Sequence, residues 1–161
     1  MDLSVLSFEG LRRTQNLHPL FVHFPLALLP TSFCFFAIGA VFRRQDFQFA
    51  GRAVLLLATI SMILAWFTGF RAEAALGVVE PRSAVLRSHL TIGTILTGMT
   101  VFLFAWSRAY AADEPRPRWL FLALFGIAVM GSLVTGDLGA QLVYVKGASV
   151  QSQGAQNPKK F

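Results

Sequence analysis

The chain contains three histidines, and each lies near the beginning of a long hydrophobic segment. His18 and His23 occur in the run NLHPLFVHFP, and His89 occurs in RSHLTIG. An ionisable side chain inside a bilayer is expensive, so an intramembrane histidine indicates a functional site by default. A neutral imidazole binds transition metals and haem iron. The three residues therefore predict a ligand site near one face of a membrane.

The spacing of the histidines limits how they can share a ligand. His18 and His23 project about 140° apart around a helix, so they cannot hold one metal as an i, i+4 pair would. We expect instead that His23 pairs with His89 across a helix bundle, as two axial ligands of a haem iron. His18 is the alternative ligand, or bonds a haem propionate. No C-x-x-C-H motif occurs, so a haem would be non-covalent, that is haem b.

Further polar residues are predicted at the same membrane face. Arg71 would neutralise a propionate, and Asp137 and Tyr144 would support the ligands. Each also has a structural interpretation, since Arg71 can reach the interface and Asp137 can accept a structural hydrogen bond. A zinc or copper site is less favoured, because nothing fixes a tetrahedral arrangement. The predicted cofactor-binding set is His18, His23, His89, Arg71, Asp137 and Tyr144, with His23 and His89 as the metal ligands.

Composition places these residues in a membrane protein. The chain is 55% hydrophobic and 14% charged, with a mean hydropathy of +0.58, whereas soluble domains carry about 25% charged residues. Four stretches are long enough to span a bilayer, near 18–42, 53–71, 85–108 and 118–145. Short connections between them predict an all-α, integral membrane, antiparallel four-helix bundle over residues 17–146. Residues 1–16 are expected to form an interfacial segment, and residues 147–161 an exposed polar tail.

Small residues recur every four positions in the fourth span. Ala128, Ser132, Gly136 and Ala140 form one row, and a second row lies beside it. Small residues let helix backbones approach closely in lipid, so this helix is predicted to be the most enclosed. No internal repeat of useful strength is recognised in the sequence. The single cysteine, Cys34, can form no disulfide within the chain.

The formal charge of +6 comes from basic residues at the span ends. Such clusters determine topology and contact anionic lipids, and nucleic-acid binding is not expected without a basic stripe on a folded surface. The density of Lys and Arg in the first and third loops places those loops in the cytoplasm. The chain is thus predicted in the bacterial inner membrane, with both termini and the histidine end facing the periplasm.

Several of these residues resemble domain-of-unknown-function family 2231, a group of small bacterial four-span membrane proteins. The resemblance rests on the HP-x-x-x-HFP element that contains His18 and His23, on Thr68-Gly69, on His89, and on residues 136–150. It implies a four-helix membrane domain that sometimes accompanies c-type cytochrome domains or redox operons. One departure is Lys146-Gly147, where the resemblance implies His-Gly, so a site that used that histidine would be altered here.

Two functions follow from these features. The first is a small b-type cytochrome-like subunit that passes electrons between a quinol and a periplasmic cytochrome. The second is a non-catalytic subunit or assembly partner of a larger membrane complex, in which the polar residues are structural. A proton or small-ion carrier is a third option, motivated by Asp137 and Arg71. The sequence does not decide whether the chain is an enzyme.

Overall fold

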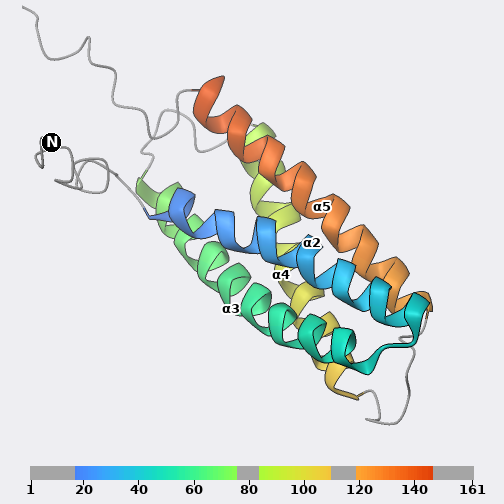
Figure 1. Cartoon of the computed structure of the whole chain (residues 1–161). Coiled ribbons are helices and arrows are strands. Elements are labelled where there is room, and N and C mark those ends of the chain that lie inside the picture. The colour runs from blue at the N-terminus through green and yellow to red at the C-terminus, as the bar shows by residue number, and fades with distance from the viewer. Residues whose placement is uncertain (1–16, 76–83, 110–118, 147–161) are drawn as a thin grey trace, which may run out of the picture.

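Four long helices make up nearly all of the computed structural model, which describes residues 17–75, 84–109 and 119–146. They are α2 (His18–Phe42), α3 (Gln45–Ala75), α4 (Ala84–Ala109) and α5 (Trp119–Tyr144) (Figure 1). All four are long and apolar enough to cross a membrane, and no strand occurs among the described residues. The prediction of an all-α membrane bundle is therefore confirmed. The predicted interfacial segment and polar tail lie outside the described residues.

The helices form a closed ring in which neighbours along the chain also pack side by side. α2 contacts α3 and α5, and α4 contacts α3 and α5, which leaves α2 and α4 diagonal to each other. Successive helices run in opposite directions, so α2 and α4 begin at the same end of the bundle (Figure 1). The ends of α3 and α5 lie there too, which brings the predicted histidine end together as expected.

The α2–α3 hairpin is the most extensively packed pair. Its turn is only two residues long, because Arg43 adopts a left-handed conformation (φ 53°) and the Arg44 N–H donates to Gly39 O at 3.0 Å. Farther along, Ser32 Oγ donates to Gly51 O at 2.7 Å between the helices. α3 begins at Gln45, eight residues before the span predicted from hydropathy, since its first turns are polar but continue the same helix.

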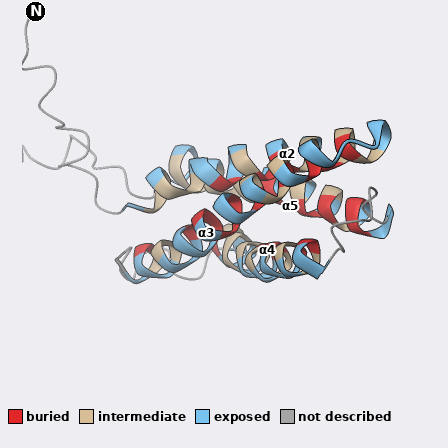
Figure 2. Cartoon of the chain, turned by 60° about the horizontal axis from the view of Figure 1, so that its bottom comes forward, coloured by how far each residue is buried: buried red, intermediate tan, exposed pale blue. Residues whose placement is uncertain are grey.

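The fully packed core lies away from the histidine end. Phe36, Phe121 and Phe125 are buried there, and the rings of Phe36 and Phe121 meet at 5.0 Å. Along α5, the buried residues run from Phe121 to Ser132, and no described residue after Ser132 is buried (Figure 2). In α2 the first buried residue is Pro25. The bundle is thus tightly packed near the α2–α3 turn and more open where α2 begins and α5 ends.

The prediction that the fourth span is the most enclosed is wrong. In their most apolar stretches, 39% of the residues of α3 are buried against 28% of those of α5. Only the inner half of the small-residue row of α5 packs into the core: Ala128 and Ser132 are buried, whereas Ala140 is exposed. α3 is the most enclosed because the short turn holds it against α2 and its other side packs on α4.

Candidate functional site

His18 is the first residue of α2, and its ring packs against the last turns of α3. Pro19 follows it, a residue that suits the start of a helix because its missing N–H has no helical partner there. His18 Nδ1 lies 2.9 Å from Ala65 O and 3.4 Å from Thr68 Oγ1. A carbonyl can only accept, so Nδ1 carries the ring proton and donates it to Ala65 O. His18 Nε2 is then the unprotonated nitrogen.

His89, in the second turn of α4, is held in the same way by α5. Its Nδ1 lies 3.0 Å from Thr135 O, and the side chain is half-buried. The same reasoning places the ring proton on Nδ1 and leaves Nε2 unprotonated. No described residue hydrogen-bonds to Nε2 of either His18 or His89.

The two imidazoles meet across the diagonal of the bundle. Their ring centroids are 5.9 Å apart, and the ring planes are at 89° to each other. The structure therefore pairs His89 of α4 with His18 of α2. The predicted pairing of His89 with His23 is not what the fold produces, and His18 takes the place that we had given to His23.

A glycine lies beneath each histidine ring. A Cβ atom on Gly69 would lie 3.1 Å from His18 Cε1, and one on Gly139 would lie 3.3 Å from His89 Cε1. Each glycine comes four residues after the carbonyl that its histidine bonds, one turn along the same helix face. A side chain at either glycine would meet the ring, so both positions keep the path from imidazole to carbonyl clear.

The two hairpins repeat one construction, although no repeat was recognised in the sequence. In α2–α3 the histidine bonds a carbonyl 47 residues later, and in α4–α5 the separation is 46 residues. A glycine follows four positions on in both cases, in the segments Ala65-x-x-x-Gly69 and Thr135-x-x-x-Gly139. Because α2 and α4 run in the same direction, the two half-sites are related by a rotation about the long axis of the bundle.

Trp66 marks the depth of the histidine pair. It adjoins Ala65, is partly exposed on α3, and donates through Nε1 to Thr94 Oγ1 at 3.1 Å. Tryptophan concentrates where a membrane meets water. The tryptophan at this level favours a position for the paired imidazoles near one membrane boundary.

His23 points away from the pair. Its side chain is exposed on the outer surface of α2, and its Nδ1 lies 2.5 Å from Pro19 O of the same helix. Since His18 and His23 are five residues apart, the rotation of the helix that turns His18 inward turns His23 outward. His23 is therefore not a partner of His89.

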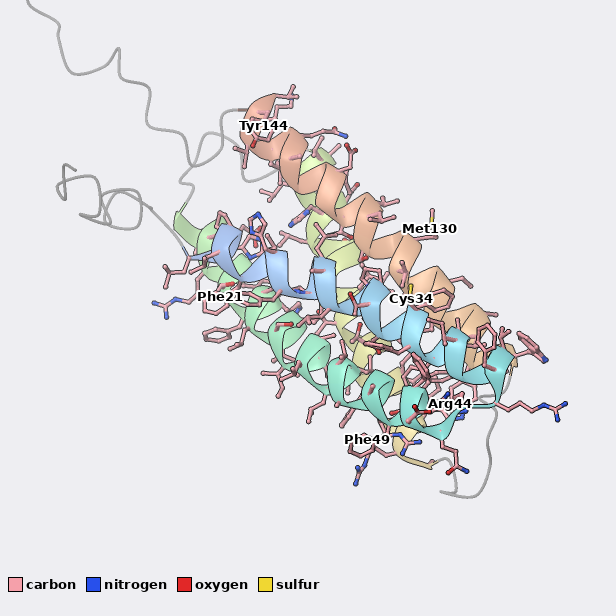
Figure 3. The ribbon with its side chains drawn as sticks, viewed as in Figure 1. Phe21, Cys34, Arg44, Phe49, Met130 and Tyr144 are labelled. Carbon is pink, nitrogen blue, oxygen red and sulfur yellow. The ribbon has the colours of Figure 1, made fainter. Side chains whose placement is uncertain are left out.

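The remaining predicted site residues are also outward-facing. Arg71 is exposed and has no ion pair with any residue that the structure describes. Asp137 is exposed on α5, and its Oδ2 accepts from Gln141 Nε2 at 2.6 Å. Tyr144, at the end of α5, is 86% exposed (Figure 3). Within the described ranges, no three His, Cys, Asp or Glu side chains come close enough to hold one metal ion.

The residues that sequence reasoning missed are the supports of the two rings. Ala65 and Thr135 act through backbone carbonyls, which no side-chain pattern reveals. Gly139 belongs to the second small-residue row, which predicts a helix contact, and Gly69 enters the sequence analysis only through the family resemblance. The usable signal was the nearly equal spacing from each histidine to its glycine, 51 residues from His18 to Gly69 and 50 residues from His89 to Gly139.

Comparison with known proteins identifies the family to which the chain belongs. The family described as "Predicted membrane protein (DUF2231)" matches residues 14–152. No curated protein matches the chain. No solved structure matches it either.

Proposed function

We propose, from the premise that the chain belongs to the predicted membrane protein family DUF2231, that His18 and His89 hold one haem b in a small electron-transfer subunit. The observation that carries this proposal is the paired anchoring of the two rings. Each Nδ1–H is held by a helix carbonyl, which leaves two unprotonated Nε2 atoms on adjoining rings. Histidines that bind metals almost always have their other nitrogen fixed in this way.

The separation of the rings fits a single metal between them. An imidazole nitrogen lies about 2 Å from the metal that it binds, so rings on opposite sides of one ion have centres roughly 6 Å apart. The observed centroid separation is 5.9 Å. An interplanar angle of 89° is compatible with two axial ligands, because their planes may take any angle about the axis through the metal. Binding would turn the rings from their present edge-to-face contact, so that both Nε2 atoms face the iron.

The surroundings of the pair support a larger group than a bare ion. Two histidines alone leave a zinc or copper ion short of protein ligands, and the described residues offer no third ligand nearby. A haem iron needs only two axial ligands, because the macrocycle supplies the rest. The open packing of α5 beyond Ser132 leaves the hairpins less tightly joined at this level.

Each residue has a defined part in the proposal. His18 and His89 would ligate the iron, and Gly69 and Gly139 would keep the rings against their carbonyls. When bound, haem supplies one-electron chemistry, and its position near one membrane face suits exchange between a hydroquinone in the bilayer and a c-type cytochrome at the surface.

One observation favours a second candidate, a structural subunit of a larger membrane complex. Each histidine bond already joins two helices of one hairpin, and the edge-to-face contact of the rings joins the two hairpins. Two such bonds, each worth about 0.5–1.5 kcal/mol, would brace the open end of the bundle without any cofactor.

An absorption spectrum decides between the two candidates. The full chain is produced in haem-supplied cells, purified in detergent, and measured before and after dithionite reduction. We expect Soret and α bands that shift on reduction, and their loss in both His18→Ala and His89→Ala. His23→Ala is the matched control, since it removes the same side chain from the same helix and should keep the bands. A colourless protein in which only His18→Ala and His89→Ala lower stability supports the structural candidate instead.

A further inference from the structure

His23 exposes its imidazole on the outer face of α2, within a helix that is long and apolar enough to cross a membrane. It lies five residues farther along α2 than His18, which places it about 7 Å deeper. His18 is level with the tryptophan-bearing turn of α3, because it bonds Ala65 next to Trp66. Ionisable residues within membrane spans almost always face the bundle interior. An outward-facing His23 at this depth therefore calls for a ligand.

The hydrogen bonds of His23 define which ligand chemistry fits. Its Nδ1 lies 2.5 Å from Pro19 O, so the ring proton is on Nδ1 and Nε2 is an acceptor. No described residue donates to that Nε2 atom. An acceptor left unpaired in hydrocarbon is costly, so the complementary group is a hydrogen-bond donor. A phospholipid phosphate offers acceptor oxygens and does not match.

The surface around His23 is apolar. Leu20 and Phe24 are 51% and 54% exposed, and Ala27 is exposed as well. These residues lie three before, one after and four after His23, so Leu20 and Ala27 flank it on the same helix face. The patch thus combines one acceptor with an apolar surround and an aromatic ring. That combination fits a molecule with a ring hydroxyl and a hydrocarbon tail.

We propose that His23 is the hydrogen-bond acceptor of a binding site for a lipid-soluble hydroquinone. A ring hydroxyl of the ligand donates to His23 Nε2, and the ring and tail lie against Leu20 and Phe24. The choice of a hydroquinone rests on the proposed electron-transfer function, whereas the binding itself requires no bound haem. His23 thereby gains a role distinct from that of the inward-facing histidine pair.

Imidazole nitrogen NMR tests the site directly, because the chain has only three histidines. Full-length protein with ¹⁵N-labelled imidazoles is placed in phosphatidylcholine nanodiscs, reduced with dithionite, and titrated with decylubiquinol. Signals are assigned from the three His→Ala variants. We expect the His23 Nε2 signal to move upfield and saturate, while those of His18 and His89 stay in place. The dimethyl ether of decylubiquinol, which lacks the donor hydroxyls, should cause no shift.

Two variants sharpen the test. Leu20→Ala should weaken the apparent affinity several-fold, whereas Thr31→Ala, on the same exposed face two turns deeper, should leave it unchanged. No shift of His23, an equal shift with the dimethyl ether, or a shift that follows anionic lipid instead of decylubiquinol overturns the proposal. The absorption spectrum tests haem separately, so a colourless protein that still binds decylubiquinol refutes the electron-transfer function alone.

Discussion

Adding one methyl group beneath His18 tests whether the imidazole is held in place as the structure indicates. In Gly69→Ala, the new Cβ would lie 3.1 Å from His18 Cε1 and 3.3 Å from Nδ1. Carbon atoms in contact prefer about 3.5–4.0 Å, so the ring must retreat by roughly 0.4–0.9 Å. The ring cannot absorb this movement by rotating freely, because Nδ1 is bonded to Ala65 O on the same helix.

The retreat lengthens and weakens the hydrogen bond. The Nδ1–O distance is now 2.9 Å, and a displacement of a few tenths of an ångström along the N–O direction takes it to the limit of about 3.2 Å for a good N–H···O bond. Leaving the half-buried donor unpaired costs about 1–3 kcal/mol. Alanine also gains up to about 1 kcal/mol over glycine in a helix interior, which offsets part of this loss.

Gly98→Ala supplies the matched control. Gly98 lies within α4, and a Cβ there would meet no atom within 4 Å. The helix-propensity gain is common to both variants and cancels in their difference. We therefore expect Gly69→Ala to unfold at a free energy about 1–3 kcal/mol below Gly98→Ala, measured by SDS titration in detergent. Gly139→Ala should fall between them, since its Cβ would lie 3.3 Å from His89 Cε1 and demands a smaller retreat.

The order of the three unfolding free energies tests the reasoning. If Gly69→Ala and Gly98→Ala unfold at the same free energy, His18 is not held against Ala65 as described, and the basis for the paired site fails. In the haem-bound protein, the reasoning further requires that Gly69→Ala alters the absorption bands while Gly98→Ala leaves them unchanged.

Three smaller changes test the frame around the site. Ser32→Ala removes the 2.7 Å bond to Gly51 O and should lower the free energy of unfolding by about 0.5–1.5 kcal/mol in SDS titration; no loss would mean that this bond does not join α2 to α3. Trp66→Phe removes the 3.1 Å bond to Thr94 and should cost a similar amount by the same assay. Arg43→Gly relieves the strain of a left-handed residue and should raise the free energy of unfolding by up to about 1 kcal/mol, seen as a higher melting temperature.

The architecture was predictable from the sequence because a bilayer leaves few choices. A chain with four apolar stretches and short connections can satisfy its backbone only as helices, and short loops make neighbours antiparallel. Hydropathy misplaced the start of α3, since the polar segment from Gln45 to Arg52 is helical without being strongly apolar. The gathering of histidines at one end follows from the alternating directions of the spans.

The rotation of each helix about its own axis was not predictable in this way. Choosing between His18 and His23 as the ligand required knowing which face of α2 meets the bundle. The sequence analysis preferred His23 because it lies deeper in the predicted span. That face is fixed about three turns deeper, where Ser32 bonds Gly51 and Phe36 packs over the same glycine. A local pattern around the histidines contains no information about this distant contact.

The repeated construction of the two hairpins explains why a pair of histidines, rather than a larger cluster, forms at this end. Each hairpin supplies one imidazole, one carbonyl and one glycine, and holds its own ring through an internal bond. The two imidazoles meet across the bundle with their ring centroids 5.9 Å apart. A haem iron, which needs one nitrogen from each side, suits such an arrangement. A metal ion that needs four protein ligands does not. The polar residues Arg71, Asp137 and Tyr144 have no counterpart in this repeat, and all three face outward.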